Sequence, residues 1–353
     1  MTDPSSGTSG LGWPSRTDGV SAPGLGQRDV SRETAASVWA GMGGAKAARD
    51  LVSAGPDVVD TVEESLPIGR QAAAAVRSAR LLRQPLPRPN RTRVVVVANQ
   101  KGGVGKTTSA VNIAAALALH GASVLVVDID PQANASTALG FRPHEAAVTT
   151  YDVLVDDVPL RDAVQPCPDV AGLLGVPASI DLAGADLELA ARQGRELLLR
   201  DRLAAYLTEV RVDYVIIDCP PTLGLLTVNA LAAGLEVLIP IQCEYYALEG
   251  LSQLLRTIDL VRDGLNPALR VTNVLLTMYD GRTRLSGEVA AEVREHFGSR
   301  VIPTAVPRSV RLSEAPGFGQ TALTYAPGSP GALSYLEAAR DIARQNEVEE
   351  ESA

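Results

Sequence analysis

Short apolar runs, rich in β-branched residues, recur along the chain and are separated by longer segments with helical patterning. The runs lie at 94–98, 123–128, 214–218, 236–241 and 271–278, with a further candidate at 301–302. Runs that are apolar throughout are typical of strands buried on both faces of a parallel sheet. Helices are predicted between and after them, at 107–120, 186–207, 248–263 and 334–345. This alternation predicts an α/β fold with a doubly wound, mostly parallel sheet flanked by helices.

The first 91 residues do not follow this pattern. Residues 1–31 are rich in Gly, Ser, Pro and Thr, and we expect them to be disordered because they cannot bury enough apolar surface to offset ordering entropy. Short helical segments are predicted around 33–54 and 69–82. From Leu66 to Arg93 the chain has seven arginines and no acidic residue, which fits either a solvated tether or an arm that contacts DNA non-specifically.

These patterns divide the chain into three parts. Residues 1–91 form a low-complexity extension with a basic linker, 92–346 form the folded domain, and 347–353 form an acidic tail. A net charge of −9 argues against coating nucleic acid by bulk charge, so DNA binding would need a local basic patch. Three widely spaced cysteines offer no disulfide framework or metal-ligand spacing, and no run has the length of a signal peptide or membrane span. We expect a cytoplasmic protein.

The first predicted strand leads into QKGGVGKTTS at 100–109, and a predicted helix follows. A strand, a glycine-rich loop and a helix start form a phosphate cradle. In such a loop Lys106 reaches the terminal phosphates and the Thr107 hydroxyl holds Mg²⁺. The common pattern G-x-x-x-x-G-K-[ST] has glycine where this chain has Gln100, and Lys101 adds a second lysine. In this respect the loop resembles the deviant Walker A loop of the ParA/MinD group of ATPases.

Two further predicted strands end in carboxylates. The run at 123–128 leads into DIDPQAN, and YVIID at 214–218 leads into CPPTLG. Carboxylates just beyond such strands lie where open parallel sheets bind their ligands. Asp130 is the candidate to orient an attacking water, whereas Asp128 is expected to be structural or near the metal. Asp218 fits the Walker B pattern, in which the carboxylate holds Mg²⁺ directly or through water.

Between about 93 and 344 the sequence resembles the chromosomal ParA/Soj family of partition ATPases. The motifs that carry the resemblance are QKGGVGKTT, DIDPQAN, DCPPTLGLLTVNAL, PIQCEYYALEGLSQLL, LLTMYDGRT, PRSVRLSEAPGFG and YAPGSPGALSY. The resemblance implies that 92–346 is a P-loop ATPase domain that uses ATP and Mg²⁺. It also implies an ATP-dependent sandwich homodimer that binds double-stranded DNA non-specifically. A ParB-like centromere-binding protein would stimulate hydrolysis of the ATP.

The resemblance also assigns the site residues. Nucleotide contacts are expected at Lys101, Gly102, Gly103, Val104, Gly105, Lys106, Thr107, Thr108, Asp218, Pro307 and Ser309, although the family has asparagine where this chain has Ser309. Catalytic roles fall to Lys101, Lys106 and Asp130, and metal contacts to Thr107, Asp130 and Asp218. Because Lys106 already serves the phosphates of its own loop, Lys101 is free to reach a phosphate across the dimer interface. Arg282 and Arg311 resemble the two arginines that contact DNA in the family.

Two other functions share the same core. A membrane-cycling ATPase of the MinD type would anchor through a basic amphipathic C-terminal helix, whereas this chain ends in acidic residues. A scaffold or DNA-binding module would use nucleotide only to set dimerisation. For the partition function, on a chromosome or a plasmid, we expect a protein that associates with the nucleoid and not with a membrane.

Overall fold

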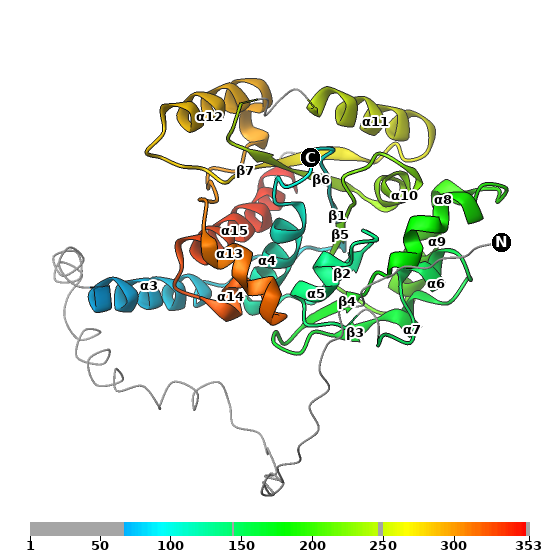
Figure 1. Ribbon diagram of the computed structural model, residues 1–353, viewed down its shortest axis with the longest axis horizontal. Helices are drawn as coiled ribbons and strands as arrows, with labels where there is room; N and C mark the ends of the chain where they lie inside the picture. The colour runs from blue at the N-terminus through cyan, green and yellow to red at the C-terminus, as the bar shows by residue number, and fades with distance from the viewer. Residues whose placement is uncertain (1–66, 143–144, 246–249, 351–353) are drawn as a thin grey trace, which may run out of the picture. The chain divides into compact units, whose positions relative to one another are not determined.

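A computed structural model describes residues 67–142, 145–245 and 250–350 (Figure 1). The segments predicted to be disordered at 1–31 and helical at 33–54 lie outside these residues. Within them the chain forms a seven-stranded sheet of order β3-β4-β2-β5-β1-β6-β7. Its strands are β1 (Arg93–Val97), β2 (Val124–Asp128), β3 (Gln165–Pro166), β4 (Leu173–Val176), β5 (Tyr214–Asp218), β6 (Glu236–Gln242) and β7 (Arg270–Thr277). All neighbours pair in parallel except β3 with β4, which confirms the predicted fold class.

The five main strands match the predicted runs, and the differences lie elsewhere. The short strands β3 and β4 were not predicted. Residues 301–302 contribute only an isolated bridge, between Val301 and Val274, and no strand. The helix predicted at 186–207 is interrupted, because Gly194 has a φ of 68° and ends the regular helical path.

The helices cover both faces of the sheet (Figure 1). They are α3 (Pro67–Leu82), α4 (Lys106–Leu119), α5 (Asn134–Ala138), α6 (Thr150–Leu154), α7 (Leu160–Ala163), α8 (Ala185–Glu188), α9 (Leu198–Glu209), α10 (Leu225–Ala233), α11 (Leu251–Gly264), α12 (Arg284–Phe297), α13 (Val310–Glu314), α14 (Ala322–Tyr325) and α15 (Pro330–Glu350). Short 3₁₀ turns are η1 (Ile180–Gly184), η2 (Arg195–Leu197), η3 (Gly298–Arg300) and η4 (Ala315–Phe318).

Alternation along the strands gives the domain two hydrophobic cores. Val95 and Val97 of β1 face the core formed with α4, α5, α14 and α15. Val94 and Val96 face the opposite core, formed with α9, α10, α11 and α12. Because both faces are buried, the strands need apolar side chains in both directions. The uniformly apolar runs in the sequence have this origin.

Where the structure describes its side chains, the basic linker contacts the domain and is not a solvated tether. We call residues 76–91 the strap. His120, at the end of α4, places Nε2 3.2 Å from the carbonyl oxygen of Leu81, and Arg88 donates to the Gly121 carbonyl at 2.7 Å. Three leucines of the strap pack against the core on the α4 and α15 face: Leu81, Leu82 and Leu86. The strap is therefore docked, because its leucines bury apolar surface on the domain. The boundaries at 92 and 346 stay predictions.

Arg93, the first residue of β1, ties this inner strand to two elements that are distant in the sequence. Its guanidinium makes two hydrogen bonds with the Glu236 carboxylate, at 2.6 and 2.5 Å, and its Nη1 donates to the Ile342 carbonyl of α15 at 2.8 Å. The side chains of Arg93 and Glu236 are only 5% and 13% exposed. This buried ion pair therefore connects β1, β6 and α15.

We expect Arg93→Ala to lower the free energy of unfolding by about 3–5 kcal/mol, because it leaves the largely buried Glu236 carboxylate without its cation, with only the Thr272 hydroxyl still donating to it at 3.2 Å. Denaturant unfolding followed by circular dichroism measures the change. Arg142→Ala is the matched control, since the pair of Arg142 with Glu145 is 77% and 67% exposed and contributes about 0–1 kcal/mol. Equal losses in the two variants would contradict the role of the buried pair.

Candidate nucleotide site

The glycine-rich loop joins the end of β1 to the start of α4, and neighbouring strands hold it in place. Asn99 donates to the Pro240 carbonyl of β6 at 2.8 Å and accepts the backbone N–H of Lys101 at 3.0 Å. Thr277, the last residue of β7, donates its hydroxyl to the Val104 carbonyl at 2.8 Å. Sequence reasoning did not assign roles to Asn99 or Thr277. Both are polar residues at the carboxyl ends of buried strands, and this position in the sequence could have identified them as site residues.

The glycines of the loop serve two different needs. Gly103 and Gly105 have φ values of 75° and 88°, a left-handed conformation that a side chain would strain. Gly102 is exposed, has no positive φ, and a Cβ added there would meet nothing within 4 Å. The fold of this chain therefore does not itself require glycine at Gly102.

The two loop lysines differ in environment. Lys106 is buried, and its Nζ donates to the Lys101 carbonyl at 3.1 Å. Burial lowers the pKa of the Lys106 ammonium, and the charges of Asp218 and Asp130 oppose that shift. The Lys101 side chain is partly exposed and makes no hydrogen bond or ion pair with any described residue. Lys106 thus faces the interior of the loop, while the Lys101 ammonium remains available to a ligand.

Asp128 is held by hydrogen bonds on both oxygens. One accepts the backbone N–H and the hydroxyl of Ser136 at 2.8 and 2.7 Å, and the other accepts the backbone N–H of Asp130 at 3.1 Å. Burial raises the pKa of Asp128 to about 6. These contacts fix the turn that carries Asp130, which fits the structural role expected for Asp128. Ser136, on α5, is a supporting residue that sequence reasoning missed.

Asp218 lies on the neighbouring strand, in register with Asp128. Both its carboxylate oxygens are buried without a hydrogen-bond partner among the described residues. Burial, and then the charge of Asp128, raise the pKa of Asp218 well above its usual range, while the Thr107 hydroxyl acts in the opposite direction. An unpaired buried carboxylate is costly unless a cation compensates it. Asp218 and Thr107 therefore fit the Mg²⁺ contacts predicted for them.

A metal at this place would need ligands besides side chains. In the described part of the chain, no group of three or more His, Cys, Asp or Glu side chains could hold a metal ion. Mg²⁺ commonly completes its shell with water and substrate phosphates. The side chains present therefore fit a metal that arrives with a nucleotide.

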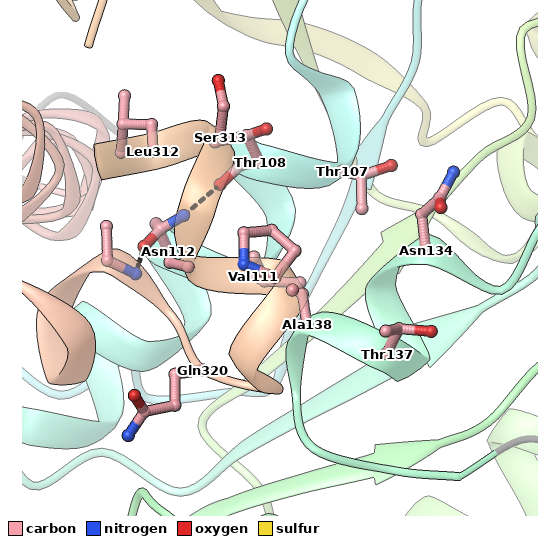
Figure 2. Close-up of a pocket in the computed structure, with 14 residues that line it drawn as sticks. Thr107, Thr108, Val111, Asn112, Asn134, Thr137, Ala138, Leu312, Ser313 and Gln320 are labelled. Carbon is pink, nitrogen blue, oxygen red and sulfur yellow. Dashed lines mark hydrogen bonds between the residues drawn. The ribbon is translucent and has the colours of Figure 1, made fainter. Parts of the chain in front are cut away.

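Two cavities flank the start of α4. The larger, about 400 Å³, lies between α4, α5 and η4 and is lined by Thr107, Thr108 and Asn134 among others. Figure 2 shows Asn112 on its wall, bonded to Thr108 of the same helix. The smaller, about 140 Å³, lies between the end of β7 and α13. Four predicted contacts line this smaller cavity: Gly105, Thr108, Pro307 and Ser309.

The two arginines predicted to contact DNA are exposed, and they follow two backbone segments that lie side by side. Tyr279 and Pro307 form a parallel bridge, and Arg282 and Arg311 follow within a few residues. Arg282 pairs with Asp280 at 2.9 Å and lowers the pKa of that carboxyl to about 2. Arg311 pairs with Glu314 at 2.8 Å. Both guanidinium groups thus have local carboxylate partners. Surface salt bridges of this kind are the alternative to DNA contact for these arginines.

Residues 92–271 match a protein family described as an AAA domain. The chain is 49% identical over 254 residues to the chromosome partitioning protein ParA of Myxococcus xanthus, covering 72% of this chain and 89% of that protein. It is 48% identical to the chromosome-partitioning ATPase Soj of Thermus thermophilus, with 71% and 96% covered.

Among solved structures, the chain resembles a protein named cobyrinic acid a,c-diamide synthase from Mycobacterium smegmatis, crystallised with ADP and magnesium. The identity is 39%, the TM-score is 0.63, and 72% of this chain and 96% of that chain are covered. No helix within the described residues is long and apolar enough to cross a membrane. The phosphate loop, the carboxylates beside it and the high identity to ParA and Soj all indicate the same family. The chain belongs to the ParA/Soj family of chromosome-partitioning ATPases.

Proposed function

We propose that this chain is an ATP-driven switch for DNA partition. ATP and Mg²⁺ bind at the phosphate loop, and the ATP-bound chain forms a homodimer that binds DNA non-specifically. A ParB-like protein stimulates hydrolysis and thereby releases the DNA. The observation that carries the proposal is the contrast between the buried, engaged Lys106 and the unengaged Lys101 beside the exposed Gly102. Such a loop can bind one nucleotide and still offer a cation to a second subunit.

Each predicted residue has a chemical task in this switch. Lys106 and the loop N–H groups bind the phosphates, and Lys101 neutralises charge that develops on phosphate across the dimer interface. Asp130 orients the attacking water from the turn that Asp128 and Ser136 hold. Thr107 and Asp218 would hold Mg²⁺, which supplies neutralising charge to the phosphate oxygens when bound.

The nucleoside is expected in the smaller cavity. Pro307 and Ser309 line it together with Thr108 at the start of α4, so a nucleotide whose phosphates lie on the loop can extend into it. The Ser309 hydroxyl can donate or accept a hydrogen bond to the base, although it is shorter than the family's asparagine. This geometry supports the expected contacts of Pro307 and Ser309 with adenine.

DNA contact is assigned to Arg282 and Arg311. The side chain of Arg282 is 90% exposed and that of Arg311 is 58% exposed, and exposed ion pairs contribute only about 0–1 kcal/mol. Both arginines can therefore exchange their carboxylate partners for phosphates at small cost. Phosphate contacts carry no sequence information, so binding is non-specific and salt-sensitive.

Arg282→Glu is expected to keep ATP-driven dimers but to lose ATP-dependent DNA binding by more than about tenfold at low salt, since a phosphate contact becomes a repulsion. Retention on immobilised DNA with ATP measures this. Arg256→Glu is the control, because Arg256 is exposed on α11 and the charge change is the same. Wild-type retention by Arg282→Glu would remove Arg282 from the DNA site.

ATP turnover with and without DNA and a ParB-like protein tests the whole switch. We expect a slow basal rate and strong stimulation when both are present. Turnover that neither DNA nor the partner changes would refute the partition function. It would favour a synthase activity of the kind named for the similar Mycobacterium smegmatis protein. ATP-dependent flotation with liposomes would instead favour a membrane-cycling ATPase. The proposal places the protein in the cytoplasm on the nucleoid.

A further inference from the structure

The strap carries a row of exposed arginines on the domain surface. Helix α3 and the proline-rich segment after it present five of them: Arg77, Arg80, Arg83, Arg88 and Arg91. The linker has no acidic residue between Leu66 and Arg93, so no carboxylate of its own neutralises the row. A local excess of positive charge is therefore present on a chain whose net charge is −9.

The strap is fixed to the domain both within α3 and in the proline-rich segment that follows it. Arg77 pairs with Glu337 of α15 at 2.8 Å, and Arg340 of the same helix donates to Gln84. The leucines of the strap also pack on the core. Its arginines are therefore held on a packed scaffold, and binding through them costs less conformational entropy than binding through a free tether.

Three of the five arginines have no carboxylate or other hydrogen-bond partner among the described residues: Arg80, Arg83 and Arg91. On α15, the Glu337 carboxylate accepts from Arg77 and the Asp341 carboxylate accepts from the Thr304 hydroxyl at 3.0 Å, and in the part of the chain that the structure describes neither forms an ion pair with these three arginines. Free guanidinium groups are planar forks that match phosphate oxygens. The row thus has both charge and unused donors to offer a polyanion.

The row is separate from the nucleotide site. The strap contacts His120 and Gly121 at the end of α4, whereas the phosphate loop is at the start of that helix. The helix has 14 residues, which corresponds to a length of about 21 Å. Figure 1 shows α3 on the side of the domain where α4 and α15 lie. The strap contacts and the predicted ATP contacts therefore lie at opposite ends of α4.

We propose that the docked strap is a second, nucleotide-independent contact surface for the phosphate backbone of DNA, with Arg80 and Arg83 at its centre. An anionic membrane fits less well, because membrane-surface helices use a free apolar face beside their basic residues. Here the strap leucines are packed on the core. This surface goes beyond the proposed switch, since it acts without ATP and without Arg282 or Arg311. It would keep the protein near DNA between ATP cycles.

The test is binding of a short labelled duplex without nucleotide, over a salt series, by wild type and Arg80→Glu/Arg83→Glu. We expect measurable wild-type binding at low salt, and an affinity lower by about tenfold or more in the variant. The slope of log affinity against log salt should fall by about 2, because each arginine neutralises one phosphate and contributes about one unit to the slope. Arg142→Glu/Arg256→Glu is the control with the same charge change, at exposed positions outside the strap, and should bind within about twofold of wild type.

The outcomes separate this surface from the ATP-driven switch. Retained ATP-dependent DNA binding in the strap variant would show that the protein is folded and that the two surfaces are distinct. Equal nucleotide-free binding by all three proteins, or none by wild type, would overturn the strap proposal whatever happens with ATP. A variant that loses only binding to vesicles of anionic phospholipid would overturn it in favour of a lipid surface.

Discussion

Lys106→Ala should lower the affinity for Mg²⁺-ATP by about 100-fold or more and reduce turnover by at least as much. The Lys106 ammonium is the buried cation of the loop, and its charge acts on Asp218 and Asp130. Charge-assisted contacts in such desolvated sites contribute a factor of about 10²–10³. In the variant, the negative charges of the nucleotide phosphates and of these carboxylates would repel each other without the lysine cation to offset them. Calorimetric titration and a turnover assay measure both effects.

Lys101→Ala is the matched control for this result. It removes the other loop lysine, whose side chain has no partner within the described residues. We expect it to bind Mg²⁺-ATP within a few-fold of wild type and to lose only the stimulated turnover. If both variants lost nucleotide affinity equally, the division of labour between the lysines would be wrong. Thermal unfolding without nucleotide checks that each variant is folded.

Gly102→Val should leave ATP binding intact and abolish ATP-driven dimerisation, so that turnover falls to the unstimulated rate. In the single chain a Cβ at Gly102 meets nothing within 4 Å, and the residue has no positive φ. The fold therefore tolerates the larger side chain. A second subunit that approaches the loop closely would not, because the valine occupies the space it needs. Sedimentation velocity with a non-hydrolysable ATP analogue measures the dimer.

Gly264→Val provides the comparison for dimerisation. Gly264 is also exposed, also has nothing within 4 Å of an added Cβ, and ends α11. It should dimerise like wild type. Normal dimerisation by Gly102→Val would exclude a sandwich built on the phosphate loop, whereas loss of ATP binding would mean that the valine disturbs the loop itself.

The central strands were predictable because their physical requirement is local. A strand covered on both faces needs apolar residues at every position, and 94–98 and 214–218 show this directly. By contrast, β4 has only four residues, Leu173–Val176, and includes a glycine. Such a short segment gives no pattern that distinguishes it from a loop.

The phosphate loop was predictable from its own residues, but its supports were not. Glycines at Gly103 and Gly105 signal a left-handed backbone. The hydrogen bond from Thr277 to Val104 joins residues 173 positions apart, and no local pattern reveals such a partner. The same reason explains the strap, because its leucines pack on a core that includes residues of α15, near the other end of the chain, and α3 contacts that helix.

Arg93 has a consequence for the order in which the protein can fold during synthesis. It begins β1, the first strand of the sheet along the chain, yet its partners are Glu236 and the Ile342 carbonyl, which the ribosome makes much later. Until α15 has emerged, the guanidinium lacks that acceptor and the core on the α4 face lacks its covering helix. Nascent chains that stop before Ile342 should therefore expose apolar surface and depend on chaperones.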